Sequence, residues 1–161
     1  MKKSARPFLL FLLCAFTGFF CFAQESQKKS QITKVAKFKP PVVKSFLGIN
    51  TNGASVTGDE ANELITLPLK ITDAQNSVYS IDSYHFLYKR KGVIEDEETG
   101  RKQATFTTVA DVFKSTPLPK IWIDNIQNRF QKGEEMFFFD IVVKDKAGRK
   151  FFAPDLKIII Q

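Results

Sequence analysis

"MFFFDIVVKDKAGRKFF", from Met136 to Phe152, holds five of the chain's 17 phenylalanines around a short charged turn. Alternate side chains of an extended strand share one face. The face expected in the core therefore contains Phe137, Phe139, Ile141 and Val143. Phe138 falls on the opposite face. The stretch by itself fits a ligand platform, a membrane-contacting surface or the core of a small β-domain, so the flanking sequence has to decide.

The segment before this strand, residues 115–133, changes to a helical pattern. Its large apolar residues recur every four positions, at Trp122, Ile126 and Phe130. Ser115 or Thr116 can cap the start of a helix, and Gly133 is typical of a helix end. We therefore expect one amphipathic helix, whose apolar face covers Phe138.

Three runs upstream have the composition of β-strands and are separated by turn-forming residues. They are "VVKSFLGI" (42–49), "LITLPLKIT" (64–72) and "VYSIDSYHFLYKRKG" (78–92). Pro68 cannot donate a ladder hydrogen bond, so the second run is expected to be an edge strand or to carry a bulge. An acidic loop with Gly100 at its turn then predicts a hairpin.

The last run, "LKIII" (156–160), predicts a strand at the C-terminal edge. These patterns together indicate a mainly β (α+β) fold. We expect a small β-sandwich-like domain of antiparallel strands with one amphipathic helix packed on a sheet.

The N-terminal segment, residues 1–23, has the pattern of an export signal. A basic start is followed by an apolar run of about 15 residues and by Ala23. This run is short for a membrane span of about 20 residues. We expect cleavage after Ala23 and a periplasmic location. Secretion from the cell and an uncleaved N-terminal anchor are the alternatives.

Both cysteines, Cys14 and Cys21, lie inside this segment. A chain processed at Ala23 therefore has neither a disulfide framework nor a thiolate metal site. Stability then has to come from an apolar core, and 45–161 is long enough to form one domain.

Residues 24–44 are predicted to form a basic, disordered linker before the domain at 45–161. The lysines that give this tail its charge are Lys28, Lys29, Lys34, Lys37 and Lys39. The tail is expected to be solvated or to make a weak electrostatic contact with an anionic surface. A nearly neutral domain in an exported chain argues against nucleic acid as a partner.

No arrangement of residues predicts catalysis. His85 is the only histidine, and it falls in the middle of a strand pattern, where a packed imidazole is the ordinary interpretation. The acidic run at 95–98 lacks the spacing of a calcium loop, so it is interpreted as a solvated hairpin tip. We therefore expect no enzyme activity, no metal and no cofactor.

The charged turn of the opening stretch is the candidate contact point. Its basic residues lie at the tip of a predicted hairpin, next to the one phenylalanine that alternation leaves off the core face. The residues predicted to bind a partner are Asp145, Lys146, Arg149, Lys150 and Phe138.

Three pieces of the chain resemble the C-terminal domain of the GldM family, a periplasmic component of gliding motility and type IX secretion in Bacteroidetes. They are "YSIDSYHFLYKRKG" (79–92), "FQKGEEMFFFDIVVK" (130–144) and "DKAGRKFFAPDLKIII" (145–160). Glu134 stands where the family has its usual acid, and Arg149 directly follows Gly148, a small departure from the family's hairpin.

The resemblance, which covers about residues 45–161, implies a non-catalytic periplasmic module. It would dock onto gliding-motility, type IX secretion or related cell-envelope proteins. The motor-coupling role of the family does not carry over to a chain with one domain. The alternative from the residues is a small-ligand or glycan-binding β-module, which needs exposed rings at Phe138, Tyr84 or Tyr88.

Overall fold

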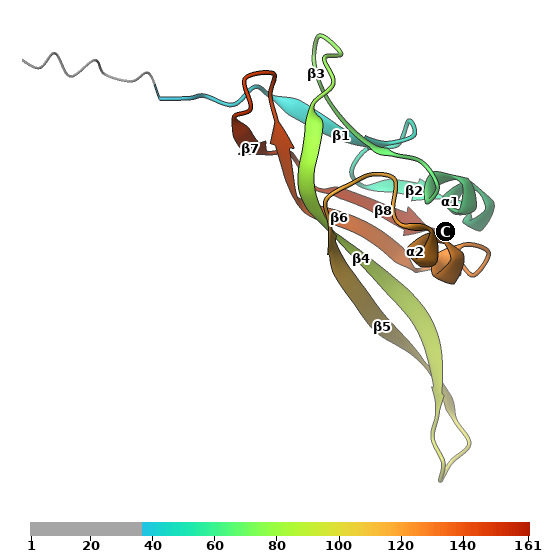
Figure 1. Cartoon of the computed structure of the whole chain (residues 1–161). Coiled ribbons are helices and arrows are strands. Elements are labelled where there is room, and N and C mark those ends of the chain that lie inside the picture. Colours follow the sequence, from blue (N-terminus) through green and yellow to red (C-terminus); the bar gives the residue numbers. More distant parts are fainter. Residues whose placement is uncertain (1–36) are drawn as a thin grey trace, which may run out of the picture. The chain divides into compact units, whose positions relative to one another are not determined.

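The computed structural model describes residues 37–161, which contain eight strands and two short helices (Figure 1). The predicted signal peptide and Lys28, Lys29 and Lys34 lie outside the described residues. The elements in chain order are β1 (Val43–Leu47), β2 (Ala54–Val56), α1 (Gly58–Leu64), β3 (Leu69–Asp73), β4 (Ser80–Glu95), β5 (Lys102–Phe113), α2 (Lys120–Ile126), β6 (Glu135–Lys144), β7 (Lys150–Phe152) and β8 (Leu156–Ile160). The first strand begins two residues before the expected domain start at 45.

The main sheet has the strand order β2-β8-β6-β4-β5, and β7 pairs with β6 beside this path. All of its pairs are antiparallel except β2 with β8. A second, two-stranded sheet joins β1 and β3. The mainly β class with antiparallel strands is therefore confirmed. The position of β8 is not as expected, because the strand lies inside the sheet and short β2 takes the edge.

The core lies between the inner face of the main sheet, the two-stranded sheet and the helices. Tyr84, Phe86 and Tyr88 of β4 lie on one face of the strand, point into the core and are at most 3% exposed. The buried cluster also includes Val43 and Ile71 of the smaller sheet. A single apolar cluster thus holds both sheets together.

A bulge in β6 overturns part of the predicted alternation. Asp140 has a φ of 48°, and β6 carries one more residue than β4 between the pairs that join it to Ser83 and His85. Side chains after the bulge therefore change faces. Phe138 is 2% exposed and faces the core, whereas Phe137 and Phe139 are half-buried on the outer face. The expectation that Phe137 and Phe139 lie in the core was wrong. Ile141 and Val143 are buried, as expected.

The predicted helix over 115–133 is much shorter in the structure. It starts after Pro119 without a side-chain cap and ends at Ile126. Thr116 does not cap it, since its hydroxyl accepts a hydrogen bond from the Leu69 backbone N–H at 2.7 Å. Phe130 lies beyond the helix but still packs its ring edge-on against Tyr88, with ring centroids 5.7 Å apart. The segment from α2 to Phe130 covers the sheet as expected, although only its first part is helical.

The second helix, α1, was not predicted. Thr57 caps it by accepting a hydrogen bond from the Glu60 N–H at 3.3 Å, and acidic residues fill its first turn. The expected strand over 64–72 is therefore wrong in its first half. Leu64 ends the helix, and Pro68 precedes β3 instead of interrupting it.

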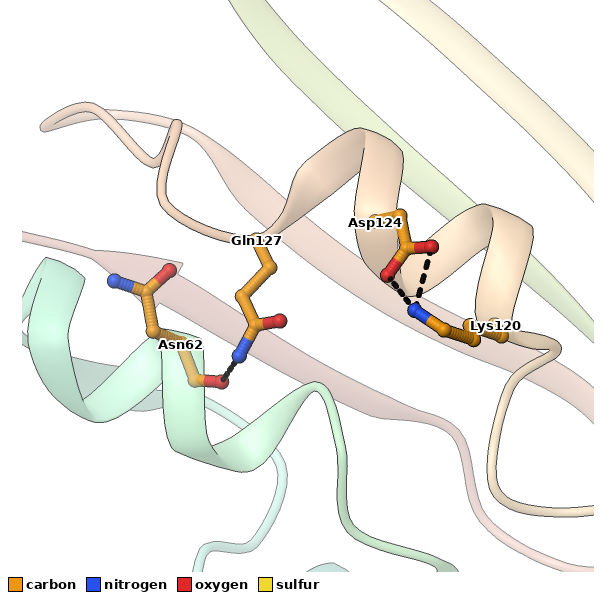
Figure 2. A network of polar contacts seen from close by, with 4 residues as sticks. All are labelled: Asn62, Lys120, Asp124 and Gln127. Atoms are coloured by element: carbon orange, nitrogen blue, oxygen red, sulfur yellow. Dashed lines mark hydrogen bonds and ion pairs between the residues drawn. The ribbon is translucent and has the colours of Figure 1, made fainter.

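The two helices contact each other through polar groups (Figure 2). The side-chain amide of Gln127 donates to the Asn62 carbonyl at 3.1 Å, and the Asn128 N–H donates to the Asn62 side chain at 2.6 Å. Within α2, Lys120 pairs with Asp124 at 2.7 Å. The two hydrogen bonds to Asn62 hold the end of α2 beside α1, and Trp122 of α2 stands edge-on to Phe86 and Phe113.

Candidate functional site

The predicted contact turn connects β6 to β7 and is built around Asp145. One carboxylate oxygen accepts hydrogen bonds from the N–H groups of Ala147 and Arg149, at 2.8 and 2.9 Å. Gly148 supplies the left-handed conformation that closes the turn, with a φ of 76°. The backbone hydrogen bond from Arg149, opposed by desolvation and helped by its side chain, lowers the pKa of Asp145 below 3.8. The turn is therefore a rigid platform for its basic side chains.

Arg149 is held from two sides. Its Nε donates to the second oxygen of Asp145 at 2.7 Å, and its guanidinium lies 4.2 Å from the centre of the Phe38 ring. Phe38 in turn contacts the buried Phe151 at a centroid distance of 6.2 Å. The segment that leads into β1 therefore positions this cation against the turn.

A cleft of about 510 Å³ opens between this turn and the segment before β4. It is lined in part by Phe38, Lys39, Tyr79, Asp145, Lys146 and Arg149. Tyr79 forms a fixed wall because its hydroxyl donates to Asp73 at 3.0 Å and its ring stands edge-on to Phe151. Three cations and one carboxylate at the cleft favour an acidic ligand.

The structure thus brings together three of the five predicted contact residues, Asp145, Lys146 and Arg149, and adds Lys39 from the predicted tail. Lys150 lies beside them but pairs with Asp82 at 2.6 Å, in an ion cluster that also includes Lys144. Lys37 is exposed.

Phe138 does not belong to this site, and its prediction as a contact residue was wrong. The ring is 2% exposed and packs against Phe86, with centroids 4.8 Å apart. Tyr84 and Tyr88 are buried as well, at 0% and 3% exposure. The three rings that a glycan-binding module would need are therefore not available to a ligand.

A second cleft, of about 560 Å³, lies where the β4–β5 hairpin leaves the cover of α2. Arg90, Arg129 and Trp122 line it. This cleft was not predicted from the sequence, although the basic run at 89–91, directly after the buried part of β4, is a signal that could have indicated it. Arg129, which follows α2, and Arg90 of β4 are far apart in the chain but line the same cleft.

Glu134 forms hydrogen bonds to Tyr88 and Lys91, two of the residues that line this second cleft. Its fully buried carboxylate accepts hydrogen bonds from the Tyr88 hydroxyl, from the Lys91 N–H at 2.9 Å and from the Gln131 N–H at 3.0 Å. Burial, and after it the hydrogen bond to Glu134, raises the pKa of Tyr88. Tyr88 and Lys91 belong to β4, whereas Gln131 and Glu134 itself lie just before β6, so Glu134 ties β4 to the start of β6.

Two further features bear on catalysis. His85 is half-buried on the outer face of the sheet, with its ring centroid 5.0 Å from that of Phe139. Within residues 37–161, no group of three or more His, Cys, Asp or Glu side chains is placed to hold a metal ion. None of the helices in this part of the chain has the length and apolar character needed to cross a membrane.

No known protein-family model matches the chain, and no curated protein matches it in sequence.

Proposed function

We propose that this protein is a non-catalytic interaction module of the periplasm. Its partner is a cell-envelope protein, of the gliding-motility or type IX secretion apparatus or related to it. The compartment and the class of partner rest on the export-signal pattern and on the resemblance to the GldM C-terminal domain. The observation that carries the docking role is the cleft at the β6–β7 turn, where Lys39, Lys146 and the fixed Arg149 converge.

The chemistry of the cleft favours an acidic segment of the partner. The Asp145 carboxylate is already engaged by three groups of its own turn, so an incoming carboxylate meets mainly the cationic side chains. Arg149 is held in place before binding, which reduces the conformational entropy lost when it pairs with a carboxylate. The Lys-rich tail adds a second, weaker attraction to an anionic surface.

The experiment places a photo-crosslinking amino acid at Lys146 in the producing cells, and at Lys132 as the control. Lys132 is also exposed but precedes the far end of β6, about 30 Å away along the strand. We expect an envelope protein to crosslink at 146 and not at 132, and Arg149→Glu to remove the adduct. Equal adducts at both positions, or none at 146, would contradict the docking site.

The cellular role is tested separately by deleting the gene and measuring surface motility and secretion. Impairment of either one supports the proposed apparatus. Normal motility and secretion together with a specific crosslink at 146 would leave the docking site in place and assign it to a different envelope partner.

A further inference from the structure

The strand at one end of the main sheet, β5, has an unusual edge. It pairs with β4 over 12 consecutive residues without a register shift, and in residues 37–161 no strand pairs with its other side. Edge strands are normally protected by charges, proline, bulges or short length. In "KQATFTTVADVF" only Lys102 and Asp111 are charged, and proline is absent. This edge is a long, regular template for another strand.

Apart from Phe113 at its end, which is buried against Trp122, the same strand is largely exposed on both faces. Phe106, Val109 and Val112 are 47%, 45% and 49% exposed. The outer half of the β4–β5 hairpin also extends away from the other elements of the domain (Figure 1). A two-stranded ribbon without a third strand or a packed layer is only marginally stable in water. Another strand paired with β5 would give the outer half of the hairpin the third strand that it lacks.

We propose that the occupant of this edge is β5 of a second copy of the chain, paired antiparallel around a two-fold axis at Thr107. An axis perpendicular to the sheet keeps the inner faces of both copies on one side, so that residues of the same parity come opposite each other. With Thr107 on the axis, Gln103 comes opposite Asp111 and can donate to its carboxylate. The two main sheets then form one continuous sheet.

Charge complementarity favours this occupant. The hairpin tip carries the four acidic residues of the run Glu95–Glu98 against the two basic residues Arg101 and Lys102, so its net charge is negative; the other end of β5 is followed by the exposed Lys114. In the proposed register Gly100, which lies two residues after the acidic run, comes opposite Lys114 of the second copy. The two-fold axis repeats this contact, so an acidic tip lies beside a basic strand end at two places in the dimer. A parallel arrangement would instead place one acidic tip beside the other.

The test measures the mass of the full chain by sedimentation velocity over a range of concentrations. Thr107→Lys and Thr107→Glu each place two like charges face to face on the axis. Either change is expected to raise the dimer Kd roughly tenfold or more. An equimolar mixture of the two variants should form a heterodimer again, because the opposed charges are then unlike. Thr51→Lys, at an exposed loop position outside β5, is the matched control and should dimerise like the wild type.

Circular dichroism of each variant checks that the exposed substitutions leave the fold intact. A monomeric wild type, or a mixture that stays monomeric, would overturn the proposal. Capture of a different protein through β5 by a monomeric chain would overturn it as well. None of the substituted residues belongs to the β6–β7 cleft. The dimer proposal can therefore be refuted or supported independently of the proposed docking site.

Discussion

The two halves of the β4–β5 hairpin belong to one ladder but have opposite surroundings. In the inner half, Tyr84 and Phe86 are completely buried beneath α2 and the segments around it. In the outer half, Val93 and Ile94 are 64% and 60% exposed. The ladder between the strands is regular along its whole length. Backbone pairing is therefore compatible with both environments, and the layer packed above the strand decides which half stabilises the fold.

The largest effect that should separate the halves is the loss of an aromatic ring. Phe86→Ala removes a buried ring in contact with Trp122 and Phe138, and should cost about 3–5 kcal/mol of unfolding free energy. Phe106→Ala, in the outer half, removes a ring that contacts Lys89 and should cost less than about 1 kcal/mol. Urea unfolding at low protein concentration measures both values. Similar losses for the two variants would show that the outer half is also part of the core.

The next effect concerns the point where the halves meet. Glu134→Gln weakens the buried carboxylate contacts to Tyr88 and Lys91, and should cost about 1.5–3 kcal/mol. The neighbouring Glu135→Gln is the control. It disrupts partly exposed pairs with Lys89 and Lys157, and should cost less than about 1 kcal/mol. Thermal and urea unfolding compare the two, and an equal loss would refute the anchoring role of Glu134.

A smaller effect distinguishes the two hairpin turns. Gly100 at the tip and Gly148 in the β6–β7 turn both have left-handed backbones, with φ of 64° and 76°, and an added Cβ has open space at each. Alanine should cost roughly 1–2 kcal/mol of backbone strain at either position. We expect Gly148→Ala to lower global stability, whereas Gly100→Ala should only speed hydrogen exchange of amides near the tip. A global loss from Gly100→Ala would show that the tip folds together with the core.

The smallest effect is a pH dependence shared by the two turns. Hydrogen bonds from the Thr99 backbone and side chain lower the pKa of Asp96, and the Arg149 backbone N–H lowers that of Asp145. For a carboxylate whose pKa is lowered by folding, the stabilisation is complete above the ordinary value of 3.8. It is lost as the pH falls through the lower folded value.

Amide chemical shifts of Thr99 and Arg149 should therefore titrate with midpoints below 3.8. Asp96→Asn should abolish the titration at Thr99 and leave that at Arg149 unchanged. A midpoint at or above 3.8 at either amide would contradict the hydrogen-bonded carboxylate there.

Local patterns predicted much of this fold. The alternation in β4 places Tyr84, Phe86 and Tyr88 on one face, but it does not say which face is buried; the glycines at 100 and 148 marked two real turns. The helix α1 was missed, even though Thr57 followed three residues later by Glu60 is a recognisable start signal. It was overlooked because the surrounding glycine and asparagine residues favour turns.

In the candidate site, too, residues close together in the sequence could be predicted, whereas residues from distant segments could not. The charged turn predicted Asp145, Lys146 and Arg149 as neighbours because they lie within five consecutive residues. Phe38 and Tyr79 could not be assigned to the same cleft, since they come from segments far away in the chain. The assignment of Phe138 to a partner surface was wrong because the expected cover above β6 does bury this ring, which is 2% exposed.

The sequence by itself determined the β class, the hairpin turns and which residues of β4 share a face, because these depend on alternation and on residues that tolerate left-handed backbones. Only the tertiary structure decided which phenylalanines of β6 are buried. The bulge at Asp140 reverses the alternation within the strand, and α2 and the segment to Phe130 cover only the inner face. The period of a strand predicts that two faces differ, but the layer packed on the sheet determines which of them becomes the core.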